Sequence, residues 1–358
     1  MMITSKNLPK ISVIIPAYNS EKTIKHTIQS ALNQTFSNFE LIIINDGSQD
    51  STLEVVTQIQ DSRIKVFSYS NAGGNVSRNR GLDHAVGEFV SFLDADDLWT
   101  PDKLQCQLKA LQENVTTKVA YSWTDYINAN GKFLLLGKRI NVNGNVYENL
   151  LINNFLENGS NPLICRKALI TLGGFDESLS AAQDWDMWLR LASKFDFICV
   201  PSVQILYRIS CNSVSSNLVR QEKACLQLLE RAYKVRPSLR DATRTTLKHS
   251  WNISLANLYK YLTCKALQEP FNQQKTIAAA RFLWKYFIND PSRLQNINFT
   301  LKLLLKIIII FILPTLLYSI TNRREVRSQE TETLLNIWVA KNRPENKNGY
   351  LDAFTISS

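Results

Sequence analysis

The chain has 358 residues, of which 45% are hydrophobic and 20% charged, and its formal net charge is +10. This length and composition predict a globular protein with one large core or two modest ones, and they exclude disordered, collagen-like and low-complexity architectures. The six cysteines form no C-x-x-C pair and the three histidines stand alone, so we expect neither a zinc site nor a disulfide framework. No secretory signal is recognisable at the N-terminus, which predicts a cytoplasmic protein.

Short apolar runs alternate with helical patterns over the first hundred residues, which is typical of a parallel sheet built from βα units. The predicted strands are 11–15, 40–44, 63–69 and 88–93, and the predicted helices are 23–34, a segment ending near 60, 75–85 and a segment after Pro101. From about residue 120 the runs are shorter and the loops longer, so we expect a mixed second half of the sheet. Its predicted elements are a helix at 184–194 and strands at 197–200 and 204–208.

The C-terminal part differs from the rest in composition. Segments rich in Leu, Ala, Lys and Arg at 217–235, 239–266 and 271–289 predict helices. We therefore expect three regions, which are an α/β domain at 1–215, a helical region at 216–300 and an apolar helix with a basic tail at 301–358.

The positive charge is concentrated in this C-terminal part. Residues 1–208 carry 19 Lys and Arg against 21 Asp and Glu, whereas residues 209–358 carry 22 against 10. A basic region of this kind can bind nucleic acid, contact anionic lipid headgroups or simply face solvent. The apolar run Leu303–Ile320 lies inside it and is followed by Arg323 and Arg324. That combination favours a membrane surface over nucleic acid.

The run Leu303–Ile320 is interrupted by Lys306 and Pro314. A membrane-spanning helix, an interfacial helix and a buried core helix therefore remain open. The flanking positive charges favour an interfacial helix on the cytoplasmic face of a membrane.

Three polar clusters follow predicted strands, namely Pro16-Ala-Tyr-Asn19, Asn45-Asp-Gly-Ser48 and Asp94-Ala-Asp-Asp97. In an open parallel sheet, the carboxyl ends of the strands meet helix N-termini and form the ligand site. A single Asp or Asn in such a place is usually a helix cap or a turn residue. Three clusters at one edge of the sheet favour a binding site.

The acidic turn, Asp94–Asp97, carries the sharpest signal. Two carboxylates separated by one residue can hold a hard divalent cation that keeps its other positions for water and phosphate oxygens, whereas capping a helix needs a single Asp. The chain has neither a Walker phosphate loop nor a G-x-G-x-x-G fingerprint. We therefore expect a metal to neutralise any bound phosphate.

A fourth cluster runs from Gly173 to Leu191. The helical spacing of Trp185 and Trp188 predicts a helix that packs on the sheet, with Asp184 at its N-terminus. Asp184 is then either an N-cap or a general base. Partial burial beside aromatic rings raises the pKa of a carboxyl group and a helix N-terminus lowers it, and both effects are expected here.

These motifs resemble family 2 of the inverting, nucleotide-sugar-dependent glycosyltransferases, which have the GT-A fold. The resemblance covers about residues 10–215 in matching order and spacing. It rests on the segments SVIIPAYNSEKTIKHTIQSALNQTF, ELIIINDGSQDST, SRNRGL, GEFVSFLDADDLW, GGFDESL and QDWDMWLRLA. It implies an α/β fold with a Rossmann-like, mixed central sheet flanked by helices, followed by an α-helical C-terminal region.

The resemblance also implies which residues bind the nucleotide. Pro16, Ala17 and Tyr18 are expected to line the nucleobase pocket. Asp46 is expected to hydrogen-bond the base, and Arg78 to reach the nucleotide.

The family's Asp-x-Asp corresponds to Asp94 and Asp96, which implies that Asp94 lies near the ribose and that Asp96 binds Mg²⁺ or Mn²⁺ on the diphosphate. Asp184 matches the family's catalytic base. The implied reaction is a single displacement in which Asp184 takes the proton of the attacking hydroxyl and the metal stabilises the departing nucleoside diphosphate.

The sequence departs from the family pattern at two places. Gln183 stands where the family has a Glu before the base, and Arg208-Ile-Ser210 lacks the His that many relatives carry two residues after the Arg. The Q-x-x-R-W motif of processive synthases is also missing, which favours an enzyme that adds a single sugar.

The expected partners are a nucleotide-sugar donor, a UDP-sugar above all, a glycan or lipid-linked acceptor, and a membrane surface, but no nucleic acid. The expected location is cytoplasmic, peripheral or monotopic at the inner face of the cell membrane. Two other functions remain open, which are a degenerate sugar-nucleotide-binding module and a nucleotidyltransferase that makes sugar nucleotides. The position after the first strand reads Pro-Ala-Tyr-Asn rather than a Gly- and Lys-rich phosphate loop, which disfavours the second.

Overall fold

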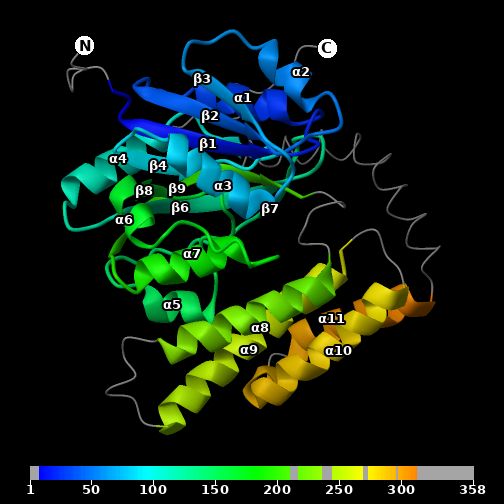
Figure 1. The fold of residues 1–358 in the computed structure, drawn as a ribbon. Helices are drawn as coiled ribbons and strands as arrows, with labels where there is room; N and C mark the ends of the chain where they lie inside the picture. The colour runs from blue at the N-terminus through cyan, green and yellow to red at the C-terminus, as the bar shows by residue number, and fades with distance from the viewer. Residues whose placement is uncertain (1–7, 210–216, 236–243, 269–272, 296, 313–358) are drawn as a thin grey trace, which may run out of the picture. The chain divides into compact units, whose positions relative to one another are not determined.

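The computed structural model describes residues 8–209, 217–235, 244–268, 273–295 and 297–312. The chain divides into two compact units between Ser254 and Leu255, inside a long helix. The first unit holds the sheet and all the residues proposed above for the site (Figure 1).

The first unit contains nine strands in its described residues. They are β1 (Ile11–Ala17), β2 (Phe39–Asn45), β3 (Ile64–Ser68), β4 (Phe89–Phe92), β5 (Leu98–Trp99), β6 (Val119–Ile127), β7 (Phe133–Leu136), β8 (Leu163–Cys165) and β9 (Phe197–Arg208). The helices that lie wholly within it are α1 (Ile24–Leu32), α2 (Thr52–Thr57), α3 (Gly74–His84), α4 (Lys103–Glu113), α5 (Tyr147–Ile152), α6 (Arg166–Thr171), α7 (Gln183–Ala192) and α8 (Leu218–Lys234).

The strands form one mixed sheet in the order β3-β2-β1-β4-β8-β6-β9-β5, with β7 paired to β6. Strands β1 to β4 are parallel, whereas β8 is antiparallel to both of its neighbours. The chain moves from β1 outward to β2 and β3 and then returns to β4 on the other side of β1. The strand order therefore reverses between β1 and β4, which is where open α/β sheets bind ligands.

Helices cover both faces of the parallel half. On one face, Val13, Ile15 and Leu41 pack into a core with residues of α1, α2 and α4. On the other face, α3 approaches so closely that a Cβ at Gly81 would lie 2.3 Å from a methyl group of Ile14. A side chain at position 81 would force α3 away from β1, so this glycine sets the distance between helix and sheet.

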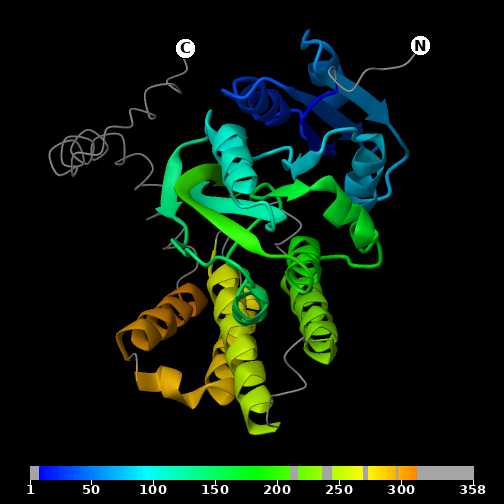
Figure 2. The same ribbon diagram turned by 90° about the vertical axis from the view of Figure 1, so that its left-hand side faces the viewer.

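The predicted strands and helices occur in the predicted order, β5, β7, β8, α5 and α6 were not predicted, and one element is corrected. Residues 197–200 and 204–208 belong to one strand, β9, which runs parallel to β6 and curves along it in Figure 2. The pairing to β6 skips Pro201 and Ser202. Such a bulge accommodates a proline, which has no N–H to donate, without ending the strand.

Helix α9 (Arg244–Ala266) crosses from the first unit into the second, which also contains α10 (Gln273–Asn289), a 3₁₀ helix (Pro291–Gln295) and α11 (Ile297–Ile312). In this unit Tyr259 stacks on Phe282 with 6.1 Å between ring centroids. Within the described chain, no helix is both long and apolar enough to cross a bilayer. Helix α11 contains the first ten residues of the apolar run Leu303–Ile320, and residues 313–320 lie outside the described residues.

Candidate active site

Two of the polar clusters meet at the point where the strand order reverses. Pro16 and Ala17 are the last residues of β1, and Tyr18 follows with 47% of its surface exposed. The acidic turn begins two residues after β4, and the amide of Leu93 donates to the carbonyl of Ile14 at 2.9 Å. The carboxyl ends of β1 and β4 are thus hydrogen-bonded to each other, which places an exposed aromatic ring and the acidic turn at the same edge of the sheet.

The last residue of the acidic turn, Asp97, holds the turn in place through its fully buried carboxylate. Its Oδ1 accepts the amide of Arg208 at 3.0 Å, and its Oδ2 accepts the hydroxyl of Ser160. The same hydroxyl accepts the amide of Asp94 at 3.0 Å. Burial raises the pKa of Asp97 well above its usual value, and the charges of Asp96 and Asp94 add to this. Asp97 is therefore structural, and it is not a helix cap, since the N-cap of α4 is Asp102.

Arg208 binds the backbone of the acidic turn and of the β6–β7 hairpin. Its Nε donates to the carbonyl of Asp96 at 2.7 Å, and its Nη1 donates to the carbonyls of Asn128 and Ala129. Over the described ranges, the carboxylate of Asp96 forms no ion pair. Burial and the neighbouring charge of Asp94 raise the pKa of Asp96 to about 6. The carboxylate oxygens of Asp96 thus lie next to other negative side chains and can bind a cation.

These residues fit a divalent cation that shares its coordination with a ligand. No group of three or more His, Cys, Asp or Glu side chains in the described residues is arranged to hold a metal. A cation such as Mg²⁺ needs only one or two carboxylates when phosphate oxygens and water fill its other positions. The half-buried, unpaired carboxylate of Asp96 beside Asp94 supplies that donor set.

Arg78, on α3, contacts the acidic turn at Asp94. Its guanidinium forms an ion pair with Asp94 and lies 5.6 Å from the centroid of the Phe175 ring. A Cβ at Gly159 would lie 3.5 Å from Asp94 Oδ2 and 3.6 Å from Arg78 Nη2. The pair thus lies between the Phe175 ring and the backbone at Gly159, and the side chains of Arg78 and Asp94 stay 14% and 26% exposed.

Asp46 holds the loop that leads into α3. Its carboxylate accepts the amides of Ala72 at 3.0 Å and Gly73 at 2.8 Å, and Arg80 Nη1 lies 3.3 Å from it. Gly47 follows with a φ of 71°, and a Cβ there would lie 2.9 Å from the amide nitrogen of Asn71. Asp46 is only 3% exposed. Its carboxylate is thus engaged by the loop before α3 and by Arg80.

Asp184 is the second residue of α7 and not its N-cap. The cap position is Ala182, which has a left-handed backbone with φ 58° and no side chain that caps the helix. Asp184 Oδ1 accepts the amide of Trp185 at 2.8 Å, and Oδ2 accepts the Asn154 amide at 3.4 Å. Asp184 is therefore not the N-cap of α7, although its Oδ1 atom satisfies one amide of the first turn.

Burial raises the pKa of Asp184 above its usual value, so burial outweighs the hydrogen bond from the backbone. The charges of Arg78 and Asp94 act on it in opposite directions, which places Asp184 in electrostatic range of the acidic turn. The structure thus brings Arg78, Asp94, Asp96 and Asp184 into one site. A carboxyl group with a raised pKa in such a place can accept a proton from a ligand.

Two asparagines that support this site were not among the residues predicted for it, although Asn79 belongs to the segment SRNRGL. Asn75 and Asn79 of α3 donate to carbonyls of the loop before α7, at Asp176, Leu179 and Phe175, with distances of 2.7–3.0 Å. These bonds link residues about a hundred positions apart in the chain. They fix the loop that places Asp184. A lone Asn within a helix shows no such role in a single sequence.

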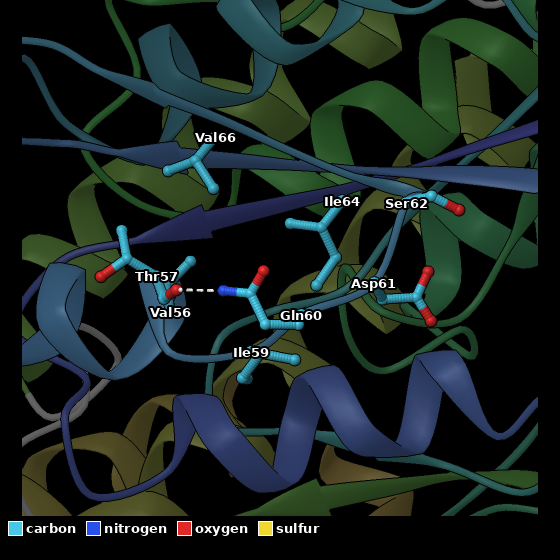
Figure 3. A pocket seen from close by; sticks show the side chains of 8 residues that line it. All are labelled: Val56, Thr57, Ile59, Gln60, Asp61, Ser62, Ile64 and Val66. Carbon is cyan, nitrogen blue, oxygen red and sulfur yellow. Dashed lines mark hydrogen bonds between the residues drawn. The ribbon is translucent and has the colours of Figure 1, made fainter.

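A cavity elsewhere in the described residues does not involve these side chains. It has a volume of about 570 Å³ and is lined by the end of α2 and the start of β3, where Gln60 donates to the carbonyl of Thr57 at 3.2 Å (Figure 3). The start of a parallel strand is the edge of the sheet opposite to the acidic turn. Its lining contains Asp61 as the single charged side chain. This cavity therefore lies away from the candidate site.

Comparison with known proteins shows what this arrangement is similar to. The model of glycosyltransferase-like family 2 matches residues 12–262. The chain is 33% identical over 223 residues to Escherichia coli UDP-Glc:alpha-D-GlcNAc-diphosphoundecaprenol beta-1,3-glucosyltransferase WfgD, covering 60% of this chain and 82% of that protein. It is 33% identical over 218 residues to the putative teichuronic acid biosynthesis glycosyltransferase TuaG of Bacillus subtilis, covering 58% and 82%.

An uncharacterized glycosyltransferase of Rickettsia conorii is 36% identical over 200 residues, and the chain covers 31% of that protein's length. Among solved structures, the fold is similar to Staphylococcus aureus TarS 1–349 in complex with UDP, with a TM-score of 0.53 and 18% identity over 80% of this chain and 92% of that one. It is also similar to the mannosyltransferase PcManGT of Pyrobaculum calidifontis in complex with GDP-Man and Mn²⁺, with a TM-score of 0.52 and 17% identity over 86% and 88%. These likenesses confirm the predicted GT-A fold with its helical C-terminal region.

Proposed function

Because the chain belongs to glycosyltransferase-like family 2, we propose that it is an inverting glycosyltransferase that moves a sugar from a nucleoside-diphosphate sugar to an acceptor hydroxyl. The observation that carries the proposal is the meeting of Arg78, Asp94, Asp96 and Asp184 beyond the carboxyl ends of β1 and β4. One positive and several negative groups converge there on a place open to a ligand. This is the arrangement that a diphosphate, its counter-cation and a base for the acceptor require.

We assign the donor nucleotide to the edge formed by β1, β2 and α3. The exposed ring of Tyr18 offers a face to the nucleobase, and Asp46 holds the loop at Ala72 and Gly73 that forms the wall beside it. We assign Arg78 to the nucleotide and Asp94, its ion-pair partner, to the ribose. A UDP-sugar is the proposed donor, since TarS is bound to UDP and WfgD is named for UDP-Glc.

We assign the divalent cation, Mg²⁺ or Mn²⁺, to Asp96 with Asp94 beside it. Bound there, it would supply charge stabilisation for the departing diphosphate. The chain itself keeps the acidic turn in place through Asp97, Ser160 and Arg208. Those bonds fix the backbone that carries Asp94 and Asp96 before any ligand arrives, so little reorganisation of the turn is needed at the moment of reaction.

We assign the proton transfer to Asp184. Its raised pKa makes it a better proton acceptor than an ordinary aspartate. Its Oδ2 atom accepts a hydrogen bond from the side-chain amide of Asn154. The Oδ1 atom of Asn154 is buried and has no hydrogen-bond partner in the described structure. An acceptor hydroxyl that donated to it would be placed next to the base. A single displacement by this hydroxyl inverts the anomeric carbon and needs no covalent enzyme nucleophile.

We propose a glycan or lipid-linked acceptor, used at the inner face of the cell membrane. WfgD is named for a diphosphoundecaprenol-linked acceptor and TuaG for teichuronic acid biosynthesis. The basic C-terminal part of this chain suits contact with a membrane surface.

The test is hydrolysis of a panel of UDP-, GDP- and dTDP-sugars by the full chain, with and without Mn²⁺ or Mg²⁺, followed by the same panel with a lipid-linked acceptor. We expect one donor to be turned over, with a requirement for metal that Asp96→Ala removes. Asp184→Asn should retain donor binding and lose turnover. Tight nucleotide binding without turnover, even with the acceptor present, would instead indicate a binding module, and no nucleotide binding would refute the assignment of Asp46, Asp94 and Asp96.

A further inference from the structure

Helix α11 turns apolar side chains toward the outside. Seven large apolar residues of this helix are 40–64% exposed, namely Leu301, Leu304, Leu305, Ile308, Ile309, Phe311 and Ile312. Leu303 and Ile310, on the opposite side by helical spacing, are buried. A surface helix of a water-soluble unit normally shows the reverse pattern, with a polar outer face. The outer face of α11 therefore lacks the composition that water favours.

Helix α10 carries a second outward stripe in the same unit. Ile277, Trp284 and Ile288 are 60%, 68% and 59% exposed and lie on one line of the helix, with the exposed Arg281 between them. The buried residues of α10, such as Phe282 and Tyr286, face the other way. An exposed tryptophan beside an arginine is the pairing found where proteins meet the headgroup region of a membrane.

Basic residues outnumber acidic ones in residues 255–312 of this unit. Residues 255–312 carry eight Lys and Arg against two Asp and Glu, and α11 has no acidic residue. Lys302 and Lys306 are exposed and follow each other on one flank of the apolar face of α11. Their alkyl stems can lie along that face while the ammonium groups reach headgroup phosphates.

Charge decides which partner covers this surface. A second copy would bring the same positive charge against it, which is unfavourable at an interface. An anionic bilayer offers apolar depth for the stripes and negative headgroups for the flanking lysines. We propose that the unit beginning at Leu255 docks on an anionic lipid surface, with α11 lying in the plane of the membrane and its outer face in the acyl boundary.

This inference rests on the proposed function only for the identity of the membrane, which is the inner face of the cell membrane. Its test does not use transferase activity. The full chain is incubated with vesicles of phosphatidylcholine alone and with vesicles of equal parts phosphatidylcholine and phosphatidylglycerol, and bound protein is measured by flotation. We expect binding to the anionic vesicles that weakens as salt is raised. Absence of binding to the anionic vesicles would overturn the proposal while leaving the proposed transferase untouched.

Variants locate the surface. Leu305→Glu with Ile308→Glu should abolish flotation, and Lys302→Gln with Lys306→Gln should weaken binding by about fivefold per lysine. The matched control is Val219→Glu with Val235→Glu, which places the same two charges at apolar residues in and directly after α8 that are each 70% exposed. Each variant is checked for its unfolding midpoint so that loss of binding is not loss of fold. Equal binding by Leu305→Glu with Ile308→Glu and by the control would overturn the assignment to α11.

Trp284 reports the depth of contact. Vesicles with brominated acyl chains should quench the fluorescence of the full chain, and part of that quenching should disappear in Trp284→Phe. Unchanged quenching in Trp284→Phe would remove α10 from the docking surface. If sedimentation without lipid shows a dimer that Leu305→Glu with Ile308→Glu dissociates, a second copy covers the stripe and the lipid proposal is wrong.

Discussion

The acidic turn and the start of α7 contribute carboxylates to the same site but are held in opposite ways. The acidic turn is fixed by residues distant in the chain, since Ser160 and Arg208 bind its side chains and its backbone. Asp184 depends on the amide of the next residue at 2.8 Å and on Asn154 at 3.4 Å. The acidic turn is thus cross-linked by short bonds to distant residues, whereas the carboxylate of Asp184 is held by one amide of its own helix and one long bond from Asn154. Binding of the nucleotide and removal of the proton should therefore respond differently to mutation.

The largest effect is expected from Asp184→Asn, which removes the proposed base and leaves the acidic turn unchanged. Asparagine keeps the size of the side chain and removes its ability to accept a proton, so transfer should fall by about 10²–10⁴-fold with nucleotide affinity unchanged. The matched control is Asp186→Asn, two residues further along α7, where the carboxylate is paired with Arg190 at 2.7 Å. The rate constant for transfer and the dissociation constant for nucleotide are measured for both. A comparable loss in Asp186→Asn would mean that helix distortion, not proton transfer, explains the result.

The next effect is on nucleotide binding and comes from Asp46→Asn. The new amide group can accept one of the two N–H groups of Ala72 and Gly73 and leaves the other without a partner, which costs about 1–3 kcal/mol. If the loop forms the base pocket, affinity for the nucleotide should fall by about 5–150-fold, measured by calorimetry. Asp50→Asn serves as the control, because this carboxylate also accepts two backbone amides, but they belong to Glu21 and Thr52 and not to the loop before α3. Unchanged affinity in Asp46→Asn would separate this loop from the nucleotide.

The sequence allowed part of this site to be predicted. Asp94, Asp96 and Asp46 stood out because strand ends converge in an open sheet, and that rule depends only on the order of apolar runs. Ser160 and Asn75 could not be found in this way, since their partners lie 66 and about a hundred residues away. Such contacts depend on how loops pack after the sheet has formed. For the same reason, one sequence did not show that Pro201 sits in a bulge of a continuous β9 rather than in a break between strands.

Ser160→Ala tests whether the acidic turn is rigid because of its cross-links. The substitution removes the acceptor of the Asp94 amide and the donor to Asp97, both within a fully buried site, so the free energy of unfolding should fall by about 1–3 kcal/mol. Donor hydrolysis in saturating metal should fall as well, because the turn loses its fixed position. Ser178→Ala, at an exposed serine that also bonds a carboxylate, is the control in urea unfolding. If the two variants lose equal stability, the serine hydroxyl does not cross-link the turn.

The smallest effect is a shift in pH dependence, and it sharpens the contrast at Asp184. The base must be deprotonated to act, so transfer falls as the pH drops through the pKa of Asp184, which burial raises. In Gln183→Glu a second carboxylate stands beside Asp184 and opposes its ionisation, so the acid limb of the rate profile should move to higher pH by up to about one unit. Gln183→Met keeps the site neutral and should leave the limb in place. If the acid limb does not move in Gln183→Glu while transfer stays intact, the limb belongs to another group. The half-buried Asp96 is then the first candidate. In that case the rate profile of Asp96→Asn should lack the acid limb.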